Sequence, residues 1–265
     1  MGSTFEYGSS EPGYNCRASA ACTPELPKNV VANARQFDFT HMADRIRTVP
    51  VQVTVPAGKT ASVILQGGKM LLRYRDRQNP ALFTMAQTMD VPSSGGMYFL
   101  GDVEVEGTFN GQLSIGSSGN IIITDNIVYT DADPVTGKPK EDSPNVLGLI
   151  AEGNVKVNQT QSMMTLGKGI IIDAAVVALN KSFEVVNYRQ YQQSMGNMQL
   201  WGSVIQWERG IMGNVRMRGT IKQGYVKKWH YDRRLSALSL PFFPPLVDEK
   251  GNMTFKTVYW GRSNV

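Results

Sequence analysis

The segment from Ile205 to Leu235 holds the residues of this chain that are best suited to binding chemistry. It contains eight basic side chains and two acidic ones, with aromatic rings between them. Because cationic groups bind phosphates and rings stack on planar bases, this mixture favours a polyanion such as DNA or an acidic polysaccharide. The predicted polyanion-binding residues are Arg209, Arg216, Arg218, Lys222, Lys227, Lys228, Trp229, Arg233 and Arg234.

A structural role accounts for the same residues. Large rings cover the open end of a stacked fold, and Lys and Arg keep that end soluble and prevent edge-to-edge association. A basic patch marks a region of positive potential but does not by itself define a site, so both interpretations stay open at this point.

Catalytic signals are weak. The chain has two histidines, His41 and His230, and it contains neither the Gly-x-Ser-x-Gly nor the His-Glu-x-x-His motif. Asp125, Asp131 and Asp133 resemble the carboxylates of a polysaccharide-cleaving β-helix, but aspartates in such a loop more often form turns. We therefore predict a non-enzymatic protein without a cofactor or a metal. A carbohydrate-active β-helix enzyme is the alternative.

The two cysteines, Cys16 and Cys22, lie in one Gly/Ala/Ser-rich segment near the N-terminus. No further Cys or nearby His completes a metal site, so the sequence predicts a disulfide that closes a small loop in an oxidising compartment. Two unpaired thiols are the alternative.

Four apolar doublets predict the fold that positions these residues. They recur at steps of 27, 27 and 28 residues, at Ile122-Ile123, Leu149-Ile150, Val176-Val177 and Val204-Ile205. Each doublet lies in a short run of β-branched or small residues, which is typical of strands, and a repeat of this length predicts stacked coils. We therefore expect an all-β protein, a right-handed parallel β-solenoid. A two-sheet sandwich with evenly spaced hairpins, one of them at Asn110-Gly111, is the alternative.

Gly-Asp and Gly-Asn pairs mark the expected corners between strands. They occur at Gly101-Asp102, Gly119-Asn120 and Gly153-Asn154, each before an alternating apolar segment. Gly and Asn adopt the backbone angles of sharp corners, and alternation then directs every second side chain inward. The pattern places Val103, Val105, Val155 and Val157 inside, with Glu104 and Lys156 facing water.

The chain divides into four predicted regions. Residues 1–35 are loop-like, and residues 36–96 hold a short helix capped by Thr40 and a β-hairpin around Pro56-Ala-Gly58-Lys59. Residues 97–206 form the coils, with a polar insertion at 130–145 that we expect to loop outward because it lacks apolar residues. Residues 207–265 form an aromatic and basic cap, which the end of a solenoid requires.

Composition is consistent with an exported protein. Charged residues make up 18% of the 265 residues, and the formal net charge is +5. No apolar stretch reaches the ~20 residues of a membrane span. The opening Met1-Gly2-Ser3 looks like an expression scar, which predicts that an export signal or anchoring helix has been removed.

Several short motifs, taken in order, resemble a known domain. They span residues 97–245 and comprise Tyr98–Thr108, Gly148–Val155, Ala174–Phe183, Gly202–Gly210, Gly224-Tyr225, Tyr231–Leu235 and Pro244-Pro245. This series is similar to a largely uncharacterised domain of bacterial surface proteins associated with type IV pili, which are PilX-like or minor pilin-like. The resemblance implies an N-terminal anchoring helix upstream and export to the cell surface, with other pilus subunits as partners.

These observations predict an extracellular or cell-surface binding or adhesion module. Its rigid coils would present side chains in ordered rows, and its basic and aromatic end would contact DNA or an acidic polysaccharide. A purely structural filament spacer is a further alternative.

Overall fold

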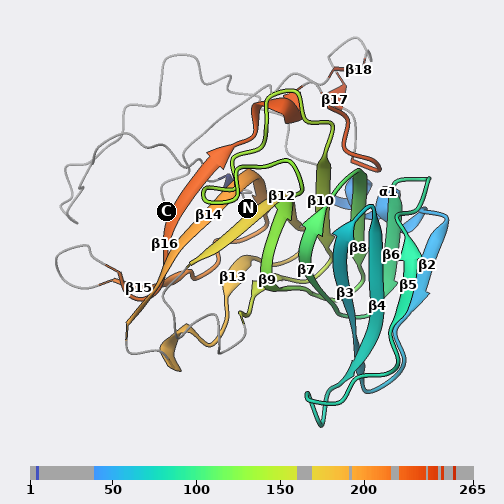
Figure 1. Cartoon of the computed structure of the whole chain (residues 1–265), viewed down its shortest axis with the longest axis horizontal. Helices are drawn as coiled ribbons and strands as arrows, with labels where there is room; N and C mark the ends of the chain where they lie inside the picture. The colour runs from blue at the N-terminus through green and yellow to red at the C-terminus, as the bar shows by residue number, and fades with distance from the viewer. Residues whose placement is uncertain are drawn as a thin grey trace.

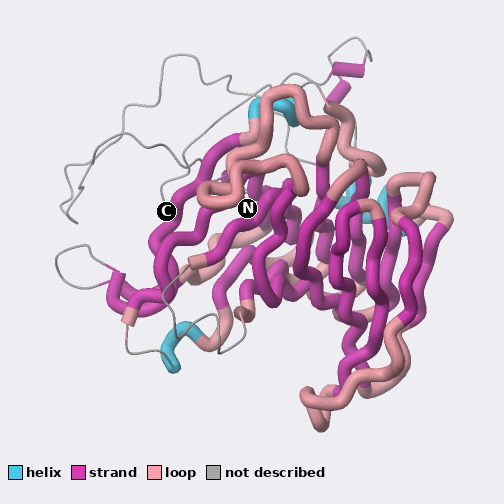
Figure 2. The backbone as a smooth tube through the Cα atoms, viewed as in Figure 1, coloured by secondary structure: helices cyan, strands magenta, loops and turns pink. Residues whose placement is uncertain are grey.

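The chain is built mainly from β-strands. The computed structural model describes residues 4–5, 39–159, 169–190, 193–215, 221–236, 238–243, 246–247 and 253–254. Its helical pieces are α1 (Phe39–Arg47) and two 3-10 turns, η1 (Tyr188–Gln190) and η2 (Arg233–Ser236). The strands, shown in Figures 1 and 2, are β1 (Thr4–Phe5), β2 (Val51–Thr54), β3 (Lys59–Gly67), β4 (Lys69–Asp76), β5 (Gln87–Asp90), β6 (Gly96–Leu100), β7 (Val103–Phe109), β8 (Gln112–Ser117), β9 (Ile121–Tyr129), β10 (Val146–Ala151), β11 (Val155–Val157), β12 (Ile170–Ala178), β13 (Phe183–Val185), β14 (Ser194–Gln206), β15 (Gly213–Val215), β16 (Ile221–Tyr231), β17 (Leu246–Val247) and β18 (Met253–Thr254).

Sixteen of the described strands form one curled, open sheet, a half-barrel. Its hydrogen-bonded path β2-β6-β8-β10-β12-β9-β7-β3-β4-β5 turns back on itself at β12. Strand β12 belongs to both halves of this path, because its C-terminal residues pair with β10 while Ile172 pairs with Ile127 of β9. We call β2, β6, β8, β10 and the C-terminal half of β12 the first wall, and β3, β7, β9, β11 and β13 the second wall. The expectation of an all-β protein is confirmed.

Three of the four apolar doublets lie in register. Leu149-Ile150 pairs with Val176-Val177 in parallel, and Val176-Val177 pairs with Val204-Ile205. The prediction for the remaining doublet was wrong, because Ile122-Ile123 lies in the second wall. There it pairs with β7 and β11.

The hairpin predictions were also wrong. Asn110-Gly111 connects β7 to β8, but β7 pairs with β3 and β9 whereas β8 pairs with β6 and β10. The turn at 56–59 likewise separates β2 in the first wall from β3 in the second. Both turns therefore carry the chain from one wall to the other. The hairpin in this region is the antiparallel pair of β3 and β4.

A ladder of polar side chains joins successive layers at the predicted corners. Asn120 donates from its backbone N–H and its Nδ2 to Asp102 Oδ1, at 2.8 and 3.0 Å. Asn154 donates in the same way to Asn120 Oδ1, at 3.0 and 3.3 Å. Ser182 then donates from its backbone N–H and its hydroxyl to Asn154 Oδ1, both at 3.2 Å. We call these four residues the corner ladder. Its sequence steps are 18, 34 and 28 residues, so the layers differ in length.

Side-chain chemistry explains the order of the corner ladder. Asn120 and Asn154 each donate to one neighbour and accept from another, which an amide does and a carboxylate does not. Asp102 ends the ladder, where only acceptance is required, and its Oδ2 lies 2.9 Å from Arg77 Nη2.

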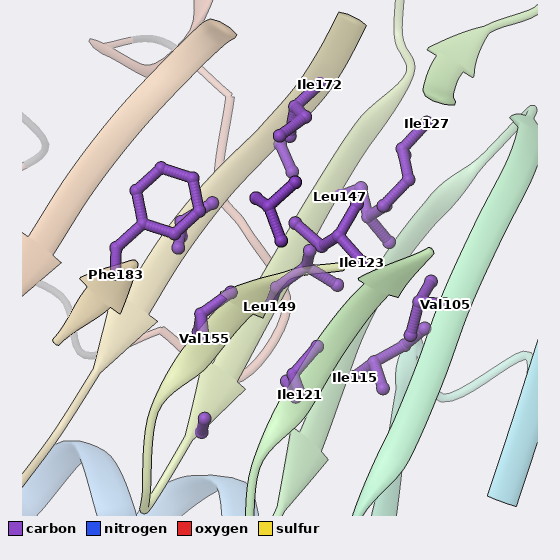
Figure 3. Close-up of a cluster of buried hydrophobic side chains, with 14 of the residues drawn as sticks. Val105, Ile115, Ile121, Ile123, Ile127, Leu147, Leu149, Val155, Ile172 and Phe183 are labelled. Carbon is purple, nitrogen blue, oxygen red and sulfur yellow. The ribbon is translucent and has the colours of Figure 1, made fainter. Parts of the chain in front are cut away.

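The space between the walls is filled by apolar side chains (Figure 3). Val105 and Ile123 of the second wall point toward Ile115 and Leu149 of the first, and all four are fully buried. Val103, Val155 and Val157 are buried as predicted, whereas the prediction for Glu104 was wrong. Glu104 is 7% exposed and lies 2.9 Å from Arg75 Nε, and burial raises the pKa of its carboxyl.

Helix α1 packs on the outer face of the first wall. Met42 and Ile46 belong to a second apolar cluster, together with Tyr98, Ile150 and Val177. Arg47 at its end donates from Nε to Glu152 Oε1 at 2.7 Å. The helix was predicted, but it begins at Phe39, so Thr40 is its second residue and not its cap.

A row of small residues on the same outer face leaves room for the segment 240–243, which we call the strap. The row follows the parallel register through Gly96, Ser114, Gly148, Ala175 and Ser203. A Cβ at Gly148 would lie 2.5 Å from the Phe243 ring and one at Gly96 would lie 2.4 Å from the Phe242 ring. Ser114 Oγ donates to the carbonyl of Pro241. Small side chains therefore allow the strap to lie directly on the sheet.

We predict that Asn120→Ala lowers the free energy of unfolding by about 1–3 kcal/mol, because it leaves two donors of Asn154 without their acceptor and removes one of the two donors to Asp102 Oδ1. Urea denaturation followed by circular dichroism measures the change. Asn110→Ala, at an exposed corner outside the ladder, is the control and should stay within about 0.5 kcal/mol. Equal losses in the two variants would contradict this role of the ladder.

Candidate functional site

Strand β16 carries most of the predicted polyanion-binding residues that the structure describes. It lies beside β14 in parallel, at the side of the molecule away from β2 to β5 in Figure 1. Its register pairs Gln199 with Lys228 and Trp201 with His230. Lys222 and Lys228 are exposed, as are Arg209 after β14 and Arg233 in η2.

Two of the predicted residues have structural roles instead. Trp229 is 7% exposed and its ring centroid lies 6.1 Å from that of Phe183, so it belongs to the core and does not offer a ring face to a ligand. Lys227 is half-buried, with its Nζ 4.6 Å from the centroid of the Trp229 ring. Alternation explains this, because Trp229 pairs with inward-facing Leu200 while Lys228 occupies the outer face.

Arg234 is the third predicted binding residue that has a structural role. Its side chain is 8% exposed and that of Asp232 is 6% exposed, with Nη2 2.7 Å from Asp232 Oδ2. Its Nη1 donates to the carbonyls of Ser143 and Asn145, at 2.8 and 3.1 Å. Arg234 therefore ties the insertion 130–145 to the C-terminal region and does not face a ligand.

Four further predicted residues lie outside the described residues. Arg216 and Arg218 fall between β15 and β16, and Cys16 and Cys22 fall in the N-terminal segment. Their predicted roles stay predictions.

A stacked pair of rings, Trp201 and His230, lies beside Lys228 on the outer face of β14 and β16. The ring centroids are 4.1 Å apart and the planes differ by 17°. Burial and the charge of Lys228 lower the pKa of His230, so the imidazole is neutral at pH 7. We call Trp201, Lys228 and His230 the outer patch. Sequence reasoning missed Trp201, although the repeat step of about one coil that separates it from His230 could have found it.

The insertion 130–145 folds back over the sheet next to the outer patch, so the expectation that it loops outward was wrong. Gly137, Pro139, Ser143 and Asn145 are buried. Trp201 Nε1 donates to the carbonyl of Thr136 at 2.8 Å. Polar groups of the insertion are satisfied by these contacts and by Arg234, which replaces the apolar burial that the sequence lacks.

The three aspartates considered for catalysis act mainly within turns and loops. Asp133 accepts backbone N–H groups of Val135 and Thr136 at 3.0 and 2.7 Å, and these bonds lower the pKa of its carboxyl. Asp131 accepts from Asn145 Nδ2 at 2.9 Å, and Asp125 accepts from the N–H of Asn126 at 2.7 Å. The role as turn formers is the one that the contacts favour.

A different aspartate, Asp173 of β12, lies under the insertion. It is fully buried, and its Oδ2 accepts the N–H of Tyr129 at 2.9 Å while its Oδ1 has no hydrogen-bond partner. Burial raises the pKa of this carboxyl to about 8, and the nearby Asp232 and Asp131 act in the same direction. Sequence reasoning missed this residue, which stands one repeat before Trp201.

Comparison with family models, curated proteins and solved structures finds no match to this chain. Within the described ranges, no helix has the length and apolar character to cross a membrane. The same ranges hold no group of three His, Cys, Asp or Glu side chains placed to bind a metal ion.

We predict that Arg234→Ala lowers the free energy of unfolding by about 3 kcal/mol, because it leaves Asp232 as a buried carboxylate without its partner. The control Lys181→Ala removes an exposed side chain after β12 and should change the free energy of unfolding by about 0.5 kcal/mol or less. Thermal unfolding of the two variants separates these outcomes. Similar stability in both would show that the buried pair is not a fixed part of the fold.

Proposed function

We propose that this protein is a right-handed parallel β-solenoid that serves as a non-enzymatic binding scaffold. Three observations support the solenoid: parallel pairing between successive layers, the corner ladder, and apolar side chains enclosed between two walls. Right-handed crossover is the general rule for parallel strands in one sheet. Export, attachment to the cell surface and association with pilus subunits follow from the sequence resemblance.

The outer patch is the region that we propose contacts a polyanion, either DNA or an acidic polysaccharide. The single observation that carries this proposal is the position of exposed Lys228 beside the stacked rings of Trp201 and His230. A cation and rings fixed by a sheet offer a phosphate or sulfate contact without a cost for ordering loops. Exposed Lys222, on the same strand, extends the positive region.

Charge reversal tests the proposal. We predict that Lys228→Glu weakens binding of a labelled oligonucleotide or of labelled heparin roughly tenfold, because it replaces an attraction by a repulsion. Fluorescence anisotropy at about 50 mM salt and about 200 mM salt measures the affinity and its salt dependence. Lys181→Glu, an exposed lysine in the turn after β12, is the matched control and should stay within about twofold. Binding that is absent, or that neither salt nor Lys228→Glu reduces, would reject the proposal.

Protonation of His230 provides a second test. The lowered pKa of His230 means that its positive charge forms only as the pH falls below the usual imidazole range. We therefore predict that polyanion affinity increases a few-fold from about pH 7.5 to about pH 5, and that His230→Gln removes this part of the increase. The same anisotropy titration at both pH values measures it. An identical pH dependence in wild type and His230→Gln would exclude His230 from the contact.

A carbohydrate-active β-helix is supported by one observation. Asp131, Asp173 and Asp232 come from different parts of the chain and influence one another electrostatically. Their arrangement differs from that of a hydrolase groove, because Asp173 and Asp232 are buried. A screen for reducing sugars released from polysaccharides tests this alternative, with Asp232→Asn as the variant that should abolish any release.

A further inference from the structure

The buried carboxyl of Asp173 has no use in polyanion binding, and its surroundings point to a different role. A carboxylate buried without full compensation is costly, so a protein tolerates this group in its neutral form. The Oδ1 atom of Asp173 faces Gly137 of the insertion, where a Cβ would lie only 3.2 Å from it. The insertion itself therefore excludes water from this group.

The charged groups that shift the ionisation of Asp173 come from several elements. Asp131 of the insertion and Asp232 after β16 disfavour its ionisation, whereas Arg234 favours it. Arg234 is already held by Asp232, with two contacts at 3.0 and 2.7 Å. Tyr129 of β9 contributes its backbone N–H, and on β16 His230 stacks on Trp201, the register partner of Asp173. No side chain among them neutralises the Asp173 carboxylate.

The insertion is held over this group by the hydrogen bond from Trp201 Nε1 to Thr136 and by the close approach of Gly137 to Ile171 and Asp173. Its C-terminal end is held by Arg234 Nη1, which donates to Ser143 and Asn145, and by the Gly111 N–H and Gln112 Nε2, which donate to Asn145 Oδ1 and to the carbonyl of Pro144. A charge formed beneath these contacts gains hydration only when the insertion lifts. The arrangement thus couples a proton to a movable segment.

We propose that the insertion 130–145 is a proton-dependent latch, which is held on the outer face of β12 and β14 while Asp173 is protonated and is released when Asp173 ionises. The released state hydrates the carboxylate. Release also breaks the bond from Trp201 to Thr136, which frees the indole in the outer patch.

The direction of the pH effect follows from linkage. Asp173 has a pKa of about 8 under the closed insertion, compared with 3.8 for a solvated aspartate. The closed state therefore binds the extra proton between these values, and closure weakens as the pH rises through this range. The fraction of open insertion rises about tenfold per pH unit and levels off above about pH 8.

Limited trypsin digestion at Lys140, inside the insertion, measures opening. The cleavage rate of the full chain is divided by that of a synthetic peptide with the same loop sequence, which removes the pH dependence of trypsin itself. Between about pH 6 and about pH 8 we expect this ratio to rise about 50-fold in the wild type, when cleavage is slow compared with closing.

Asp173→Asn should abolish this rise, because the amide is close in shape to the protonated acid but does not ionise. Asp142→Asn, at an exposed position of the same insertion, is the matched control and should retain the wild-type slope. A flat ratio in the wild type, or a wild-type slope in Asp173→Asn, overturns the latch.

Gly137→Ala gives an independent answer if Asp173→Asn fails to fold. Its methyl group would lie 2.2 Å from Ile171 Cγ2, and the residue has a φ of +70°, so the insertion should lift at every pH. Asp173 is then hydrated throughout, and we expect rapid cleavage with no dependence on pH. Rapid cleavage that keeps the wild-type slope would contradict the latch.

Discussion

The corner ladder is the constraint on which the other features of the structure depend. Each rung fixes the height and the register of one layer relative to the next, because two donors of one residue meet a single oxygen of its neighbour. Strand register in turn decides which side chains face the core. A slip of one residue would expose Val105, Ile123 and Val157 and would bury their polar neighbours. A few hydrogen bonds at one corner therefore set the position of the whole apolar interior.

The same register creates the outer surfaces. On the first wall it aligns small residues into a row that accepts the strap, and it aligns Tyr98, Ile150 and Val177 beneath α1. On β14 and β16 it brings Trp201 onto His230 and places Lys228 next to them. It also places Asp173 in the row of Trp201, where the insertion covers it. The outer patch and the latch are thus neighbours on one face, and Trp201 participates in both.

Local patterns in the sequence predicted the strands and corners well, because Gly-Asn pairs and alternating valines act over a few residues. They predicted the layer spacing poorly. The step of 27 residues from Ile122 to Leu149 connects strands of two different walls. The layers themselves are unequal in length, because one of them contains the insertion. The exposure of individual side chains was harder still to predict. Lys228 faces solvent while Trp229 is buried, and only the pairing with β14 decides which of these neighbours points inward. Asp173 gave no signal of its own, since its burial depends on a loop that the composition suggested would project into solvent.

The position of the strap has a consequence for how the chain reaches its native state. Ser114 bonds to Pro241, a residue 127 positions later, and Phe242 and Phe243 pack in the cluster that contains Met42 of α1. The outer face of the first wall is consequently finished by residues that leave the ribosome late. Until they arrive, an apolar surface from the earliest layers stays uncovered, and we expect the need for contacts between distant parts of the chain to slow folding. Nascent chains halted before residue 240 would expose this apolar face to chaperones and to one another.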